Sequence, residues 1–342
     1  MSLAVSPHHE ALCRLVAREI DREATPEVKA LAAELRRRHG APVAGVLFYG
    51  SILRARAKGE GVYDLYVLVD DYRRAYLGSP GPGGRPRGRL RSALLAAANR
   101  ALPPNVFYLE LPYEGRTLRA KYAMLSLDDF RRATLPTHLH TLVWARFSQP
   151  FLLLDARDAE ARRVVIAGAA QAIVTLVGRL VPLLRAVRRG RSFVPREFWQ
   201  RAFRETYAAE FRTESPDTVE RIYESARSRF DEALCEGLGA LGDQGRLEAE
   251  PAEPGRVRVR IDPTRRRAVR RAWRVQRPVA KALAGANLIK SAVTFGDWLP
   301  YALWKLRRHT GVVIEPTPLQ RRHPLIFGWP VILHLIRRRD LR

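Results

Sequence analysis

Two short apolar runs on either side of a Gly-Ser pair constrain the fold of this chain more than any other feature. The first run covers residues 43–49 and ends at Gly50-Ser51, and the second covers residues 62–69. The second run is rich in β-branched and aromatic residues, which is typical of a buried strand. We therefore expect two strands, joined through the Gly-Ser turn, to open a sheet.

The sequence around these runs predicts more sheet with helices beside it. Residues 8–39 have the periodicity of two amphipathic helices that are separated near Thr25-Pro26. A third strand is expected from Asn105 to Leu111, and a turn at Glu114-Gly115 would join it to a fourth strand through Tyr122.

From about residue 156 onward the sequence is mainly helical. Helices are expected near 196–212 and 217–241, and a basic strand is expected at 255–261. This order of elements resembles a winged-helix arrangement. The predicted fold class is therefore α+β: a mixed sheet flanked by helices, then a mainly helical, winged-helix-like domain and a C-terminal amphipathic segment.

The apolar segment from Val164 to Leu184 raises the question of a membrane span. Gln171, Arg179 and Pro182 interrupt it, and a span of this length normally has few such residues. We therefore favour a buried core helix.

The length and the cysteine content limit the domain organisation and the compartment. A chain of 342 residues exceeds the usual size of one hydrophobic core. We divide it into residues 1–155 for the sheet domain, 156–275 for the helical domain, and 276–342 for substrate binding and membrane association. Only Cys13 and Cys235 are present, which favours a reducing cytoplasm over a disulfide framework. No secretory signal is visible at residues 8–20.

The net charge of +25 predicts attraction to polyanions. Nucleic acid, an anionic bilayer and nucleotide phosphates all fit this charge. Arginine supplies 54 of the 60 basic residues, so composition bias and solvated helix faces explain most of the excess.

The Gly-Ser turn and the acid on the next strand have the chemistry of phosphoryl transfer. Gly50 lets the backbone approach a triphosphate, Ser51 can donate a hydrogen bond to it, and Asp64 follows after twelve intervening residues. This spacing resembles the nucleotidyltransferase superfamily that includes polymerase-β. On its own the Gly-Ser signal has a plain structural alternative, since such turns join strands in many proteins.

The second carboxylate of that superfamily pattern is missing. Tyr66 stands two residues after Asp64, on the same face of the strand, where an acid is expected. Asp70 lies about 20 Å further along an extended strand, so we expect it to be a strand-end residue with Asp71. Glu110 and Glu210 are the candidates for a second catalytic or metal-binding acid, and a surface charge is the alternative for each.

Several short motifs resemble one family in order along the chain. Phe48-Tyr49-Gly50-Ser51 and residues 64–71 look like the mitochondrial-type phosphatidate cytidylyltransferases, the translocator assembly and maintenance family, which also has a lone aspartate at the strand start. Gly115 with Lys121-Tyr122 resembles the family's Gly, Lys-Tyr-Gly segment, and residues 146–150 resemble its Gly-Arg-Leu-x-Lys-Pro segment.

The resemblance continues into the helical part and covers roughly residues 43–306. Residues 206–212 are similar to the family's Ser-Tyr-x-Gly-Asp-x-Arg, with Glu210 in place of the aspartate. Lys281 and Lys290-Ser291 keep the spacing of its paired lysines. Ala123 and Asn287 stand where the family has glycine, which leaves a related lipid or nucleotide substrate open.

The family's activity is the joining of CTP to phosphatidate to give CDP-diacylglycerol and pyrophosphate in phospholipid biosynthesis, with magnesium. A phosphate monoester is already an anionic nucleophile, so this reaction needs positioning more than a general base. The resemblance implies these roles: nucleotide binding by Tyr49, Gly50, Ser51, Tyr122 and Arg146, catalysis by Asp64 and Lys121, and substrate binding by Glu210, Arg212, Lys281, Lys290 and Ser291.

The last twenty residues predict membrane association. Arginines flank an apolar stretch from Pro324 to Ile336 that is too short to span a bilayer but suits its interface. A C-terminal helix packed on the protein body is the alternative. The expected localisation is cytoplasmic and peripheral, on the cytoplasmic face of a membrane.

Two other functions compete with this one. An inactive nucleotidyltransferase fold could bind nucleic acid through its charge, although aromatic residues do not interleave with the basic clusters as single-strand binding requires, and no specific nucleic acid is expected. A nucleotidyltransferase acting on RNA or on a small metabolite is the second alternative.

Overall fold

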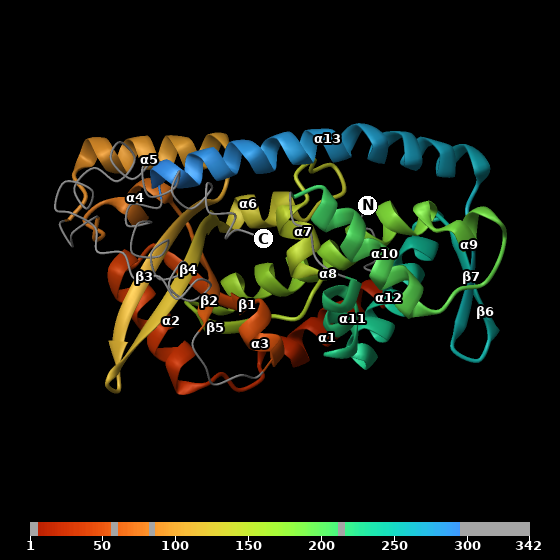
Figure 1. The fold of residues 1–342 in the computed structure, drawn as a ribbon, viewed down its shortest axis with the longest axis horizontal. Helices are drawn as coiled ribbons and strands as arrows, with labels where there is room; N and C mark the ends of the chain where they lie inside the picture. Colours follow the sequence, from red (N-terminus) through yellow and green to blue (C-terminus); the bar gives the residue numbers. More distant parts are fainter. Residues whose placement is uncertain (1–5, 56–60, 82–85, 211–215, 295–342) are drawn as a thin grey trace, which may run out of the picture.

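The computed structural model describes residues 6–55, 61–81, 86–210 and 216–294 (Figure 1). Arg212 and the predicted membrane segment at 321–342 lie outside these residues. The strands are β1 (Val43–Tyr49), β2 (Val62–Val69), β3 (Asn105–Tyr113), β4 (Arg116–Ser126), β5 (Leu152–Ala156), β6 (Glu248–Glu253) and β7 (Arg256–Arg260). The helices are α1 (Pro7–Ile20), α2 (Pro26–His39), α3 (Ser51–Ala55), α4 (Tyr72–Tyr76), α5 (Arg89–Ala101), α6 (Leu127–Ala133), α7 (Leu142–Phe147), α8 (Ala159–Leu180), α9 (Arg185–Arg188), α10 (Pro195–Ala208), α11 (Pro216–Glu224), α12 (Arg227–Asp243) and α13 (Pro263–Thr294), with a 3-10 turn at Val181–Leu183.

The main sheet is mixed and has five strands in the order β3-β4-β2-β1-β5. Strands β2 and β4 are parallel, and the other neighbours are antiparallel. The predicted strands at 43–49 and 62–69 are confirmed with the same bounds. The turn at Glu114-Gly115 is also confirmed, and both residues adopt positive φ angles. The α+β class with a mixed sheet flanked by helices is therefore correct.

The two faces of the sheet bury different side chains because successive residues of a strand alternate. Leu47, Tyr66 and Leu68 belong to a core shared with α1, α7, α8 and α12. Val46 and Val67 point the other way, into a core shared with α2 and α4. Asp64 continues the row of Tyr66 and Leu68, so its side chain lies on the α8 side of the sheet.

Helix α8 lies inside the molecule. Together with the 3-10 turn that follows, it is the single helix of the described residues that is long and apolar enough to cross a membrane. In its apolar 18-residue window, 72% is buried inside the protein. Asp158 caps its first turn by accepting a hydrogen bond from the backbone N–H of Ala161. The prediction of a buried core helix in this segment is therefore confirmed by its packing.

Helix α13 is the longest element, with 32 residues, and runs along one side of the molecule from the β6–β7 hairpin to the main sheet (Figure 1). It passes without a break through the predicted domain boundary between residues 275 and 276. Trp273 and Gln276 attach its first half to the body, by donating hydrogen bonds to the Glu205 carboxylate (3.0 Å) and the Leu139 carbonyl oxygen (2.8 Å). The predicted boundary therefore falls within one continuous helix.

The buried histidine of α2 predicts a loss of stability in acid. His39 is 5% exposed, lies 2.9 Å from the Ala75 carbonyl oxygen and 3.2 Å from the Tyr122 hydroxyl, and burial lowers its pKa from 6.5 to about 4. As the pH falls, His39 of the unfolded chain binds a proton before His39 of the folded protein does. The folded protein therefore keeps its full stability, as far as His39 is concerned, above pH 6.5 and loses stability as the pH falls towards 4. At pH 4.5 the free energy of unfolding should be lower by about 2–3 kcal/mol from this group alone.

Urea titrations at pH 7 and pH 4.5 measure this effect. His39→Gln retains a hydrogen-bonding side chain but does not titrate in this range, so the variant should lose less stability between the two pH values than the wild type. An equal pH dependence in both proteins would exclude His39 as the source.

Candidate functional site

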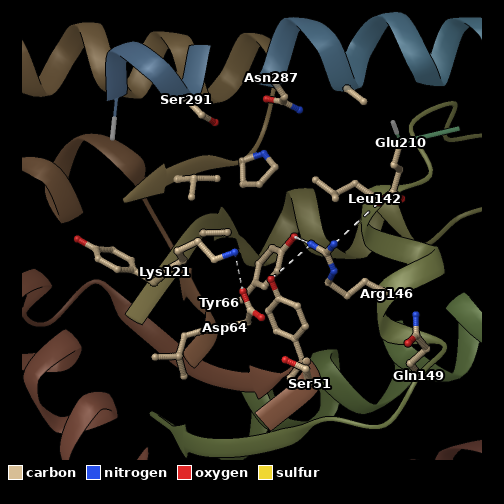
Figure 2. A pocket seen from close by; sticks show the side chains of 18 of the residues that line it. Ser51, Asp64, Tyr66, Lys121, Leu142, Arg146, Gln149, Glu210, Asn287 and Ser291 are labelled. Atoms are coloured by element: carbon tan, nitrogen blue, oxygen red, sulfur yellow. Dashed lines mark hydrogen bonds and ion pairs between the residues drawn. The ribbon is translucent and has the colours of Figure 1, made fainter. Parts of the chain in front are cut away.

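A pocket of about 630 Å³ opens on the α8 side of the sheet, beneath the last turns of α13 (Figure 2). A volume of this size is typical of small-molecule sites. Its polar lining includes Tyr49, Ser51, Arg54, Asp64, Tyr66, Lys121, His140, Arg146, Gln149, Tyr207, Glu210, Thr218, Asn287 and Ser291. The sheet supplies the floor, α7 a wall and α13 the roof.

Gly50 and Asp64 come into close contact at the floor of the pocket. Tyr49 pairs with Asp64 in the antiparallel ladder, which places the turn after β1 directly beside that carboxylate. Gly50 has a φ of +100°, and a Cβ atom there would lie 2.7 Å from Asp64 Oδ2. Only glycine therefore fits this turn without displacing the acid.

Ser51 lies on the same side of the sheet as Asp64, and its hydroxyl points into the pocket (Figure 2). It is the first residue of α3. The backbone of the Gly50-Ser51 turn and the Ser51 side chain thus line the pocket beside a carboxylate.

Lys121 reaches Asp64 from the neighbouring strand. The two residues are partners in the parallel β2–β4 register, and Lys121 Nζ is 3.1 Å from Asp64 Oδ1. Both side chains are partly exposed, at 36% and 23%. The pair faces the pocket, so an anionic ligand there can replace the Asp64 carboxylate as the ion-pair partner of the Lys121 ammonium group.

Arg146 on α7 is held in one orientation by aromatic and acidic groups. Its Nη1 lies 3.4 Å from the Tyr49 hydroxyl and 3.3 Å from the Tyr66 hydroxyl, and its guanidinium stacks over the Tyr49 ring. Glu210 approaches Nη2 at 3.9 Å and also accepts a hydrogen bond from Thr141 (3.0 Å). Burial alone would lower the pKa of Arg146, but the tyrosines, Glu210 and Asp64 together raise it well above its usual value. The pocket therefore contains a fixed positive charge.

Tyr66 has a structural reason to stand where an acid was expected. Its buried ring packs against Phe147 and Tyr49, and its hydroxyl lies within hydrogen-bonding distance of Arg146. A carboxylate in this position would have a much shorter reach than a tyrosine. The residue that breaks the superfamily pattern thus orients a cation in the pocket wall.

Two predicted site residues are placed elsewhere by the strand geometry. Tyr122 borders the pocket, but its ring is buried on the opposite face of the sheet against Phe107, with its hydroxyl beside His39. Adjacent residues alternate, so Lys121 and Tyr122 cannot both point into the pocket. The predicted nucleotide-binding role of the Tyr122 side chain is corrected accordingly.

Glu110 is likewise outside the pocket lining. It pairs with Arg119 at 3.2 Å and accepts a hydrogen bond from the Tyr108 hydroxyl. In the β3–β4 ladder Tyr108 is opposite Lys121, so Glu110 lies two residues further along the strand, opposite Arg119 and away from the pocket. Its predicted catalytic and metal-binding roles are corrected for this reason.

Of the three predicted substrate-binding residues on α13, one lines the pocket and two do not. Ser291 lines the pocket, whereas the Lys290 ammonium donates hydrogen bonds to the carbonyl oxygens of Leu102 and Pro104 (2.8 Å to Pro104). Burial lowers the pKa of Lys290 to about 8. Lys290 therefore fastens the roof to the start of β3, which differs from the predicted contact with substrate. Lys281 is exposed on α13, outside the pocket lining.

Among the lining residues that sequence reasoning missed, Arg54, His140 and Asn287 carry polar groups into the site. Arg54 lies one turn after Ser51 in α3, a spacing that could have drawn attention to it. His140 and Asn287 come from a loop and from α13, which are far apart in the sequence. No local pattern brings these last two together.

The acids of the pocket are compatible with a single magnesium ion. Among the residues that the structure describes, no three His, Cys, Asp or Glu side chains gather as a metal cluster. Mg²⁺ needs only one or two protein carboxylates when substrate phosphates and waters complete its coordination. Asp64 meets this requirement, whereas Glu210 is already engaged by Thr141 and Arg146.

Comparison with known proteins adds no identification: no protein-family model matches the sequence, and no curated protein matches it.

Proposed function

We propose that this protein is a nucleotidyltransferase that joins CTP to phosphatidate, giving CDP-diacylglycerol and pyrophosphate. The observation that carries the proposal is the contact between Gly50 and Asp64, which places a bare backbone turn and a carboxylate at one end of a pocket of nucleotide size. The choice of CTP as the nucleotide and of phosphatidate as the acceptor rests on the sequence resemblance.

The fold supports the same reading. A strand that ends in Gly-Ser, an antiparallel neighbour that begins with the acid, and a parallel third strand form a nucleotidyltransferase-type sheet in this proposal. The α12 helix with the β6–β7 hairpin would be its winged-helix-like part.

Each group of the pocket has a role in the proposed step. The Gly50-Ser51 backbone and the Ser51 hydroxyl hold the β- and γ-phosphates, and Lys121 exchanges Asp64 for an oxygen of the α-phosphate. An oxygen of the phosphatidate monoester attacks the α-phosphorus, the bond to the β-phosphate oxygen breaks, and pyrophosphate leaves. Arg146 neutralises charge on the acceptor phosphate or the nucleotide, and its tyrosine partners keep it in place.

Asp64 would hold Mg²⁺ together with oxygens of the nucleotide, where the bound ion supplies positive charge that offsets charge developing at the α-phosphate. The proposed partners are therefore CTP, phosphatidate and an anionic membrane surface. We place the protein in the cytoplasm, on the cytoplasmic face of the membrane.

The direct test incubates the purified protein with CTP labelled in its α-phosphate, Mg²⁺ and phosphatidate liposomes. Label in a lipid product is the expected result. Label transferred to RNA or to a water-soluble acceptor would replace phosphatidate with another acceptor, and tight, salt-sensitive binding of duplex DNA without turnover would replace the enzyme with a nucleic-acid-binding protein.

The membrane part of the proposal predicts a separation between binding and chemistry. Deleting residues 321–342, which carry the apolar stretch and its arginines, should weaken sedimentation with anionic liposomes more than turnover of detergent-dispersed phosphatidate. The lost basic residues each contribute about 1 kcal/mol near an anionic surface. Unchanged sedimentation would favour the packed-helix alternative for this segment.

A further inference from the structure

Two buried polar atoms on the α13 side of the pocket have no hydrogen-bond partner among the described residues. They are His140 Nε2 and Asn287 Oδ1, on side chains of residues that are 6% and 9% exposed. Both residues line the pocket. Buried polar groups are nearly always paired, so two orphans in one pocket point to a ligand that supplies the missing bonds.

The lining of the pocket on this side includes apolar side chains. Pro104, Val106, Leu142 and Ala284 line the pocket near them, from β3, α7 and α13. The charged groups of Asp64 and Lys121 lie on the floor, while Asn287 hangs from the roof (Figure 2). The pocket therefore has a carboxylate–ammonium pair on its floor and, towards α13, neutral hydrogen-bonding groups among apolar side chains, with the Arg146 guanidinium within electrostatic range of His140.

His140 is uncharged at neutral pH. Burial, followed by electrostatic interactions with His138, Arg146 and Lys290, lowers its pKa to about 4. A neutral imidazole offers one N–H donor and one acceptor nitrogen. It suits an uncharged part of a ligand better than a phosphate.

Asn287 has a defined orientation. Its Nδ2 donates to the Pro103 carbonyl oxygen at 3.4 Å, and Lys290 fixes the residues on both sides of Pro103. With the amide nitrogen used in this way, Oδ1 is left as a buried, unpaired acceptor on a side chain that hangs from the roof of the pocket (Figure 2). An acceptor pairs with an amine N–H and is left unpaired opposite a carbonyl oxygen.

We infer that His140 and Asn287 bind the base of the nucleotide, and that Asn287 Oδ1 accepts a hydrogen bond from an exocyclic amine. The site then prefers an amino-bearing base such as cytosine to uracil, whose carbonyl oxygen would face the same acceptor. This inference rests on the proposed function, because it takes the phosphates to lie at the Gly50-Ser51 end.

Binding of CTP, UTP and inorganic tripolyphosphate to the full-length protein, measured by calorimetry with Mg²⁺, tests the inference. The wild type should bind CTP about 10-fold more tightly than UTP, the effect expected of one buried hydrogen bond. Asn287→Ala should bring the two affinities close together, and His140→Phe, which removes both ring nitrogens, should weaken both nucleotides. Tripolyphosphate lacks a base and should bind all variants equally, which also reports an intact pocket.

Val275→Ala is the matched control on α13, because Val275 is 62% exposed on the outer side of the helix. It should leave the ratio of CTP to UTP affinity unchanged.

A wild type without base preference, or a preference that survives Asn287→Ala, would overturn this inference but not the proposed function. An Asn287→Ala protein whose phosphatidate affinity falls while its CTP affinity does not would assign this end to the acceptor and also overturn it. A wild type that binds neither nucleotide would overturn the proposed function as well.

Discussion

Replacing Asp64 with asparagine is expected to lower kcat/KM by about 10³-fold or more while the protein stays folded. The amide is nearly isosteric but has no negative charge to hold a divalent cation beside the nucleotide. The partner Lys121 is partly exposed, so losing the ion pair should change the free energy of unfolding by less than about 1 kcal/mol. Turnover with labelled CTP and urea denaturation measure the two quantities.

Glu110→Gln is the matched carboxamide substitution for this experiment. Glu110 lies on β3, which β4 separates from the strand of Asp64. It pairs with Arg119 and stays outside the pocket, so its variant should retain activity. The proposed metal ligand would be wrong if Asp64→Asn were fully active. A loss of activity in Glu110→Gln equal to that in Asp64→Asn would restore Glu110 as a second acid.

Gly50→Ala is expected to reduce kcat/KM by about 10²-fold through the position of the Asp64 carboxylate. The new Cβ would meet Asp64 Oδ2 at 2.7 Å, with the Asp64 Cβ at 3.2 Å, so the acid must move away from the turn. The φ of +100° adds backbone strain of about 1–3 kcal/mol. Steady-state kinetics and urea denaturation separate the lost geometry from the lost stability.

Gly115→Ala provides the control for strain without a clash. Gly115 has a φ of +74° in the β3–β4 turn, and a Cβ atom there meets nothing within 4 Å. It should cost a similar amount of stability and leave kcat/KM unchanged. Equal kinetic losses in the two alanine variants would mean that strain, rather than displacement of Asp64, explains the effect.

The sequence predicts the floor of the pocket well because neighbouring strands decide it. β-branched and aromatic runs bounded by turn residues identify β1 and β2, and the antiparallel register of these strands, with Tyr49 opposite Asp64, places Gly50 beside Asp64. The same short-range logic predicts Asp70 and Asp71 as residues that end the strand and turn the chain. In the structure β2 ends at Val69, and Asp71 is the N-cap of α4, where its carboxylate accepts from the Arg74 backbone N–H.

The walls and roof depend on information that no local pattern contains. Glu110 was expected in the pocket because the third strand was known but its register was not, and two residues of offset are enough to remove it. Tyr122 was excluded by the alternation of side chains once Lys121 faces the pocket. His140 and Asn287 line the same pocket only because α13 packs back against β3, an arrangement set by tertiary packing.

The attachment points of α13 make its residue count part of the binding site. Gln276 is bonded to the loop before α7, and Lys290 is bonded to the start of β3, so both ends of the intervening helical segment are anchored. Each residue added to or removed from that segment would turn the distal end by about 100° and shift it by about 1.5 Å. Substitutions between the anchors should thus be tolerated far better than single insertions or deletions, which would rotate Asn287 and Ser291 out of the cavity.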